Sequence, residues 1–109
     1  MNEIQIYQNQ EFGAIRTMKN EQGEAMFCGK DVAEALGYNN PLKAIRNHVD
    51  SEDKGVNELG TPGGKQKIIF INESGLYALI LSLKTRTYLV WTERGRDFIH
   101  KLLNPKYVS

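Results

Sequence analysis

Residues 30–49 constrain the fold of this chain more than any other stretch, because they predict two short helices separated by a sharp turn. Gly37 should end the first helix, since glycine alone enters the left-handed cap conformation without strain. Asn40 can cap a second helix, and Pro41 suits its first position, where no N–H is needed. The apolar residues expected on the inner side of the first helix are Val32, Ala33 and Leu36.

The second helix predicted by this stretch has two different faces. The residues expected to face inward are Ala44, Ile45, His48 and Val49. The residues expected to share the opposite, solvent face are Lys43, Arg46 and Asn47. A small buried seam opposite a basic face is typical of a helix-turn-helix, whose second helix meets nucleic acid. These three residues are therefore candidates for DNA contact, and Lys65 and Lys67 in a later hairpin are candidate phosphate contacts.

One spacing departs from the usual helix-turn-helix. Ala33 stands four residues before Gly37, as the small residue of the first helix should. The next buried position should come six residues after the glycine, but Lys43 stands there, so the turn is longer by a residue or two. An ordinary helical hairpin that covers one side of a sheet, with Lys43 and Arg46 merely solvated, is the competing interpretation.

The segments around this helix pair predict an α+β fold with a small antiparallel sheet of two hairpins and flanking helices. Ile4, Ile6 and Gln8 alternate with polar neighbours as in a half-buried strand, and a strand with Phe12, Ala14 or Ile15, and Met18 inward should follow. A turn at 20–23 then leads into a strand at 25–28. The second hairpin should join strands 56–59 and 66–71 through a loop at 60–65, where turn-forming residues cluster.

The last third of the chain predicts two further helices. Asn72 is placed to cap a helix with inward Leu76, Leu79, Ile80 and Leu83. A short strand at 88–91 and a helix from Thr92 should follow, with an apolar stripe of Phe98, Ile99, Leu102 and Leu103. That stripe packs on its own sheet or forms the seam of a homodimer. No linker divides the chain, so residues 1–109 are expected to form a single domain.

Charge and composition exclude several classes of protein. The net charge is only +1, which argues against a protein that holds DNA by bulk electrostatics. The balance is uneven, since residues 84–109 carry six basic and two acidic side chains. Cys28 is the only cysteine and lies in an apolar strand, which favours a buried, inert thiol and a reducing cytoplasm. Neither a signal pattern nor an apolar run long enough to span a membrane is present.

Arrangements typical of enzymes are missing from the sequence. Ser74 lacks the preceding glycine of a nucleophile elbow. His48 and His100 are the only histidines, and neither has a Cys or His partner at metal-ligand spacing. We therefore expect a protein that is not an enzyme and that uses no cofactor or metal.

Several motifs of the chain resemble, in order and spacing, the Bro-N domain found at the N-terminus of bacteriophage antirepressors and baculovirus repeated-ORF proteins. The motifs that carry the resemblance run from Phe12 and Arg16 through residues 26–33, 36–41, 44–45, 48–49 and 52–54 to 71–77. Residues 3–83 thus form a Bro-N-like core, whereas the basic segment 84–109 diverges from the family. Within it, residues 91–99 are similar to the end of the separate C-terminal domain of many antirepressors.

The resemblance implies a phage or prophage transcription regulator in the cytoplasm of a bacterial host. Two classes of function stay open. One is a DNA-binding regulator that uses the residues named above on double-stranded DNA. The other is a protein-interaction module that binds and inactivates a phage repressor without touching DNA. The near-neutral charge favours the second class, and the helix pair favours the first.

Overall fold

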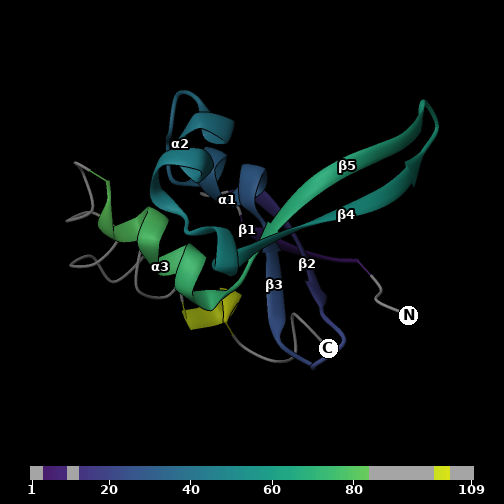
Figure 1. Ribbon diagram of the computed structural model, residues 1–109, viewed down its shortest axis with the longest axis horizontal. Helices are drawn as coiled ribbons and strands as arrows, with labels where there is room; N and C mark the ends of the chain where they lie inside the picture. The colour runs from purple at the N-terminus through teal and green to yellow at the C-terminus, as the bar shows by residue number, and fades with distance from the viewer. Residues whose placement is uncertain (1–3, 10–12, 84–99, 104–109) are drawn as a thin grey trace.

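The computed structural model describes residues 4–9, 13–83 and 100–103, which form a five-stranded antiparallel sheet with its helices on one face (Figure 1). The strand order is β1-β2-β3-β5-β4. The α+β class and both predicted hairpins are confirmed. The elements in chain order are β1 Gln5–Asn9, β2 Gly13–Lys19, β3 Ala25–Cys28, α1 Gly29–Ala35, α2 Pro41–His48, a 3-10 turn Ser51–Asp53, β4 Lys54–Thr61, β5 Gly64–Ile71 and α3 Glu73–Leu81.

The ends of α1 and α2 follow the local chemistry that the sequence predicts. Gly37 has φ +90, and the N–H groups of Gly37 and Tyr38 return to the carbonyls of Glu34 and Ala33 at 3.0 Å each. This pair of hydrogen bonds is the Schellman motif that closes a helix. The Asn40 side chain then accepts from the Lys43 N–H, with Pro41 in the first turn of α2. The two helices are therefore separate elements joined by a short turn.

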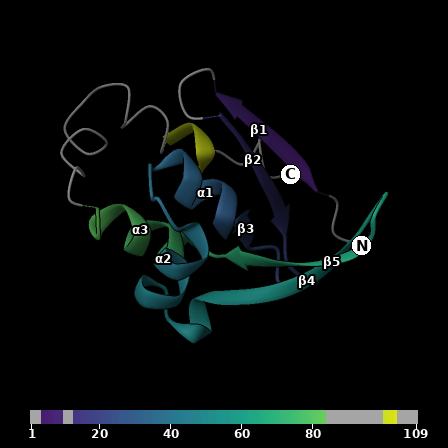
Figure 2. The same cartoon turned by 90° about the horizontal axis from the view of Figure 1, so that it is seen from above.

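The main core lies between the sheet and the helices. In Figure 2 the helices gather beside one face of the sheet, and α2 packs on α1 and α3 rather than on the sheet itself. α1 and α2 approach closely at Gly29, since a Cβ there would lie 2.8 Å from Ile45 Cδ1 and the Ile45 side chain would have to shift. The buried residues of this core include Ile15, Phe27, Val32, Leu36, Ile45, Ile71, Leu76, Leu79 and Ile80.

A second, smaller cluster lies on the opposite face of the sheet. It consists of buried Met18, Cys28, Ile68 and Phe70, with Ile4 and Met26 packed against it. Cys28 is buried as predicted, and burial raises the pKa of its thiol. Cross-strand pairing explains the grouping, since Met18 lies opposite Met26 and Cys28 lies opposite Phe70.

The inward side chains of the first hairpin were predicted partly wrongly. In β1, Tyr7 is buried and Ile6 is 59% exposed, because Tyr7 lies opposite Ile15 on the helix-covered side. In β2, Ile15 is buried and Ala14 is exposed. Met18 is buried on the other face from Ile15, so apolar residues of both faces were mistaken for one stripe. Phe12 lies outside the described residues.

The second hairpin is longer than predicted. Residues 60–65 were expected to be a loop, but the strands extend to Thr61 and restart at Gly64, leaving a turn of Pro62 and Gly63. Gly64 has φ +114, a conformation that suits glycine and lets the ladder begin at once after the turn. We call residues 54–71 the arm, since Figure 1 shows this hairpin leaving the body of the molecule.

The root of the arm is joined to α3 through one residue. The Asn72 side chain caps α3 by accepting from the Gly75 N–H at 2.9 Å. The Asn72 backbone N–H donates to the Asp53 carbonyl at 3.0 Å, and its side-chain N–H donates to the Asp53 carboxylate at 3.1 Å. The predicted cap is thus confirmed, and it also holds the start of β4.

A short segment, residues 100–103, is described near the end of the chain. Residues 100–102 are helical, Leu102 is fully buried in the main core and Leu103 packs against it. This packing agrees with the alternative that the stripe folds back on its own domain. Phe98 and Ile99, and the strand predicted at 88–91, lie outside the described residues. None of the helices described is long and apolar enough to cross a membrane.

Candidate nucleic-acid interface

Helix α2 presents a polar face to solvent. Ala44 and Ile45 are buried against the rest of the protein, which turns Lys43, Arg46 and Asn47 outward. All three predicted contact residues are exposed. Asn40 caps the start of the helix, and the buried Ala44 and Ile45 fix its rotation about its own axis. The three exposed side chains therefore point in a defined direction.

The two cations on this face are electrostatically free within the described part of the chain. The ion pairs there join Arg16 to Asp31 at 2.8 Å and Lys30 to Glu34 at 3.9 Å, and neither involves Lys43 or Arg46. Arg46 also lies in the last turn of α2, where a positive charge is favoured by the helix dipole. The face is therefore available to bind an anionic group.

The arm adds two further lysines. Lys65 and Lys67 are exposed and alternate in register with Ile69 and Ile71, whose side chains pack toward the helices. Successive side chains of a strand point to opposite faces, so both lysines project from the helix-side face of the arm. Figure 1 shows the tip of the arm and α2 both at the top of the view, on opposite sides of it. Glu58, directly opposite Lys67, is the acidic neighbour in this register.

His48 does not belong to the inward set that was predicted. It is exposed, with its ring centroid 6.0 Å from that of Tyr38. The Tyr38 hydroxyl donates to the Leu79 carbonyl at 2.7 Å, and burial raises the pKa of Tyr38. The last turn of α2 therefore ends beside a tyrosine that ties the turn between α1 and α2 to α3.

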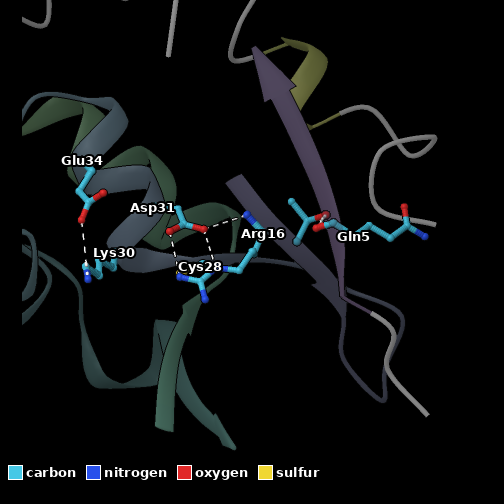
Figure 3. A network of polar contacts seen from close by, with 7 residues as sticks. Gln5, Arg16, Cys28, Lys30, Asp31 and Glu34 are labelled. Atoms are coloured by element: carbon cyan, nitrogen blue, oxygen red, sulfur yellow. Dashed lines mark hydrogen bonds and ion pairs between the residues drawn. The ribbon is translucent and has the colours of Figure 1, made fainter. Parts of the chain in front are cut away.

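A polar network that sequence reasoning missed fixes the start of α1 (Figure 3). Two nitrogens of the Arg16 guanidinium donate to the two carboxylate oxygens of Asp31 at 2.8 and 3.0 Å, and the Arg16 backbone N–H donates to the same carboxylate at 3.0 Å. The guanidinium also approaches Cys28 Sγ at 3.3 Å. Bidentate geometry of this kind is both directional and strong. The network connects β2 to α1, on which α2 packs.

The electrostatics of this network follow from its geometry. Burial alone would raise the pKa of Asp31, but the hydrogen bonds from the Arg16 side chain and backbone outweigh it and hold that pKa below its ordinary value. The side-chain hydrogen bonds to Asp31 in turn raise the pKa of the Arg16 guanidinium. An acidic residue in the first turn of a predicted helix was the available signal for Asp31, whereas no sequence pattern indicated Arg16 as its partner.

In the described ranges, no three His, Cys, Asp or Glu side chains converge in an arrangement that could hold a metal ion. The candidate site is a surface made of α2 and the arm.

The comparisons with known proteins identify the family. Residues 14–88 match the BRO family, N-terminal domain, and this match covers more than half of the chain. The chain therefore belongs to the Bro-N family, as the sequence motifs predicted. No solved structure shows a significant match to it.

Several relatives are similar over part of their length. An uncharacterized protein of Haemophilus influenzae is 41% identical over 69 residues, which cover 62% of this chain and 33% of that protein. Bro-N domain-containing protein 289L of Invertebrate iridescent virus 6 is 36% identical over 74 residues, covering 51% of this chain and 18% of the relative. Protein 201R of the same virus is 32% identical over 101 residues, covering 72% and 23%. The chain thus spans at most a third of each of these relatives.

Proposed function

We propose that this Bro-N domain is a DNA-binding regulator whose α2 contacts duplex DNA while the arm contacts phosphates. The observation that carries the proposal is the solvent face of α2, where Lys43, Arg46 and Asn47 are exposed and the two cations form no ion pair within the described residues. A short helix with a buried seam and a basic outer face suits the major groove. Membership of the family supports the same conclusion.

The side chains of α2 suggest a division of labour on DNA. Arg46 carries a planar fork that matches the O6 and N7 atoms of guanine, and Asn47 matches adenine. Lys43 supplies a point charge, which is suited to a phosphate. Lys65 and Lys67 on the arm would add phosphate contacts on the flank of the site. With a net charge of only +1, binding must come from these placed cations rather than from the protein as a whole.

The experiment that tests the proposal is a charge reversal on α2. Binding of a random-sequence DNA duplex is measured at several salt concentrations for the parent chain, Lys43→Glu and Lys43→Glu with Arg46→Glu. The matched control is Lys19→Glu, an exposed lysine at the end of β2. The turn from β2 to β3 lies at the bottom of Figure 1, away from α2. We expect the α2 variants to weaken binding and to lower the salt slope by about one for each lost phosphate contact. The control should change neither, and equal binding by all variants would refute the proposal.

A protein partner is the second candidate function, and one observation favours it. Leu42 is 55% exposed on α2, next to the proposed contact residues. An exposed leucine beside a few cations suits an acidic protein surface as well as it suits DNA. Under this proposal the chain acts as an antirepressor in a bacterial cytoplasm, by binding a phage repressor. A parent chain that binds no DNA at any salt concentration, yet captures the repressor of its source phage, would replace the first proposal with this one.

A further inference from the structure

The outer edge of β4 is open in the part of the chain that the structure describes. β4 is the last strand of the sheet and pairs with β5 on one side, and neither view shows a helix or strand beyond it (Figures 1 and 2). Its ladder with β5 continues without a bulge from Lys54 opposite Ile71 to Thr61 opposite Gly64. It also contains no proline. Natural sheets protect an edge with bulges, prolines or charged side chains. Of these β4 has only the charges of Lys54 and Glu58, and its ladder is regular over all eight residues.

The backbone groups that face outward can be assigned from the ladder. The Asn72 N–H donates to the Asp53 carbonyl, so Asp53 directs its backbone toward the neighbouring strand. In an antiparallel pair this direction alternates from residue to residue. The even-numbered residues of β4 therefore direct their N–H and C=O groups away from β5. These residues are Lys54, Val56, Glu58 and Gly60.

We propose that β4 pairs with β4 of a second copy of this chain, antiparallel and with Val56 opposite Val56 at the two-fold axis. In this register Lys54 of each copy lies directly opposite Glu58 of the other. Opposite charges at facing positions stabilise an antiparallel pair. Within one copy Glu58 lies opposite Lys67, but neither Glu58 nor Lys54 forms an ion pair in the described residues, and Val56 is 59% exposed. The pairing therefore satisfies the two charges and covers an exposed apolar side chain.

Other antiparallel registers lack this complementarity. A shift of the second copy by two residues in either direction leaves Lys54 and Glu58 without opposite partners. A shift by four residues places Glu58 against Glu58 or Lys54 against Lys54, and like charges at facing positions destabilise the pair. The charge pattern of β4 thus selects the register centred on Val56. Since an axis perpendicular to the sheet relates the copies, both helix-side faces would look the same way.

The test is the mass of the 109-residue chain in solution, measured by sedimentation over a range of concentrations without DNA. We expect the parent to dimerise, and Lys54→Glu and Glu58→Lys each to weaken the dimer about tenfold or more, because each places two pairs of like charges across the axis. The double variant Lys54→Glu with Glu58→Lys should recover the parent dimer. Lys19→Glu is the control for a changed net charge.

A second variant tests the backbone pairing itself. In Val56→Pro the lost N–H points away from β5, so the arm should keep its own ladder while the dimer is lost. Thermal melting of each variant is the check that the chain remains folded. A parent that stays monomeric at the highest concentration it tolerates would overturn the proposal. So would a dimer that the single charge variants leave unchanged, or one that the double variant does not recover.

Discussion

The body of the molecule and the arm are held in place in different ways. In the body, side chains such as Ile45 and Leu76 are 1% and 0% exposed, so packing against neighbouring elements determines where each helix lies. From Pro62 to Lys67 every residue of the arm is exposed, and its shape comes from the backbone ladder and the turn. Substitutions in the body should therefore act on folding, whereas substitutions in the outer arm should act on binding.

The largest effect is expected from the seam between α1 and α2. Ile45→Ala removes a buried side chain that packs against Gly29, and should lower the free energy of unfolding by about 2–5 kcal/mol. Leu42→Ala on the same helix is the control, since an exposed side chain should change it by less than about 0.5 kcal/mol. Denaturant unfolding of both variants measures the difference. Equal stability of the two would mean that α2 is not held by this seam.

The polar link between β2 and α1 should have the next largest effect. Asp31→Asn weakens the bidentate contact with Arg16, and a hydrogen bond of this charged kind contributes about 1.5–3 kcal/mol. The effect should depend on pH, because the folded-state pKa of Asp31 lies below its ordinary value of 3.8. Its stabilisation is fully present above the unfolded pKa and is lost as the pH falls through the folded pKa.

The measurement for Asp31 is denaturant unfolding of the parent and Asp31→Asn from neutral pH down to about pH 2. The difference in unfolding free energy should be constant near neutral pH and should shrink below about pH 4. Glu34→Gln, which removes the exposed partner of Lys30, should show almost none of this dependence. A gap between parent and Asp31→Asn that persists undiminished in acid would show that the ionised carboxylate is not what stabilises α1.

Two glycines with positive φ allow a direct comparison of the regions. Gly37→Ala in the body and Gly64→Ala in the arm both force a Cβ into the left-handed region, which costs about 1–2 kcal/mol. Neither Cβ would clash with a neighbour. The change at Gly37 should appear in global unfolding. At Gly64 the tip of the arm can open locally instead, so amide hydrogen exchange there should speed up while global stability changes less. Equal losses of global stability would mean that the arm unfolds together with the body.

The smallest effect on stability is expected from the two lysines of the arm, whose loss should mainly weaken DNA binding. Lys65→Ala with Lys67→Ala should change the free energy of unfolding by less than about 0.5 kcal/mol, since both side chains are exposed. The same variant should lower the salt slope of DNA binding by about two if each lysine contacts a phosphate. A salt slope identical to that of the parent would remove the arm from the interface.

Local chemistry made much of the fold predictable. The residues that start or end helices act on the backbone of their immediate neighbours, so a few residues of sequence are enough to predict their roles. These residues are Gly37, Asn40, Pro41 and Asn72. The α+β class followed from the same local signals. The faces of β1 and β2 were harder, because this sheet buries apolar residues on both sides and simple alternation no longer marks a single core.

The candidate site was predictable in part for the same reason. The exposure of Lys43, Arg46 and Asn47 follows from helical spacing within eight residues. The Arg16–Asp31 pair joins residues 15 positions apart, and its bidentate geometry depends on how β2 approaches α1. The extent of the arm was missed because Gly and Pro usually indicate a loop, whereas here they form the tightest turn the ladder allows. Both features depend on contacts between segments that are far apart in the sequence, and local sequence patterns do not show such contacts.

The double role of Asn72 has a mechanical consequence. The residue that starts α3 also grips Asp53 at the root of the arm through two hydrogen bonds. A hairpin joined to its domain by a free loop can change its orientation, whereas the hydrogen bonds between Asn72 and Asp53 hold the base of this one in place. A force on the tip of the arm, such as that of a bound partner, would therefore either bend the strands or displace the first turn of α3. Asn72 thus couples the base of the arm to the start of α3.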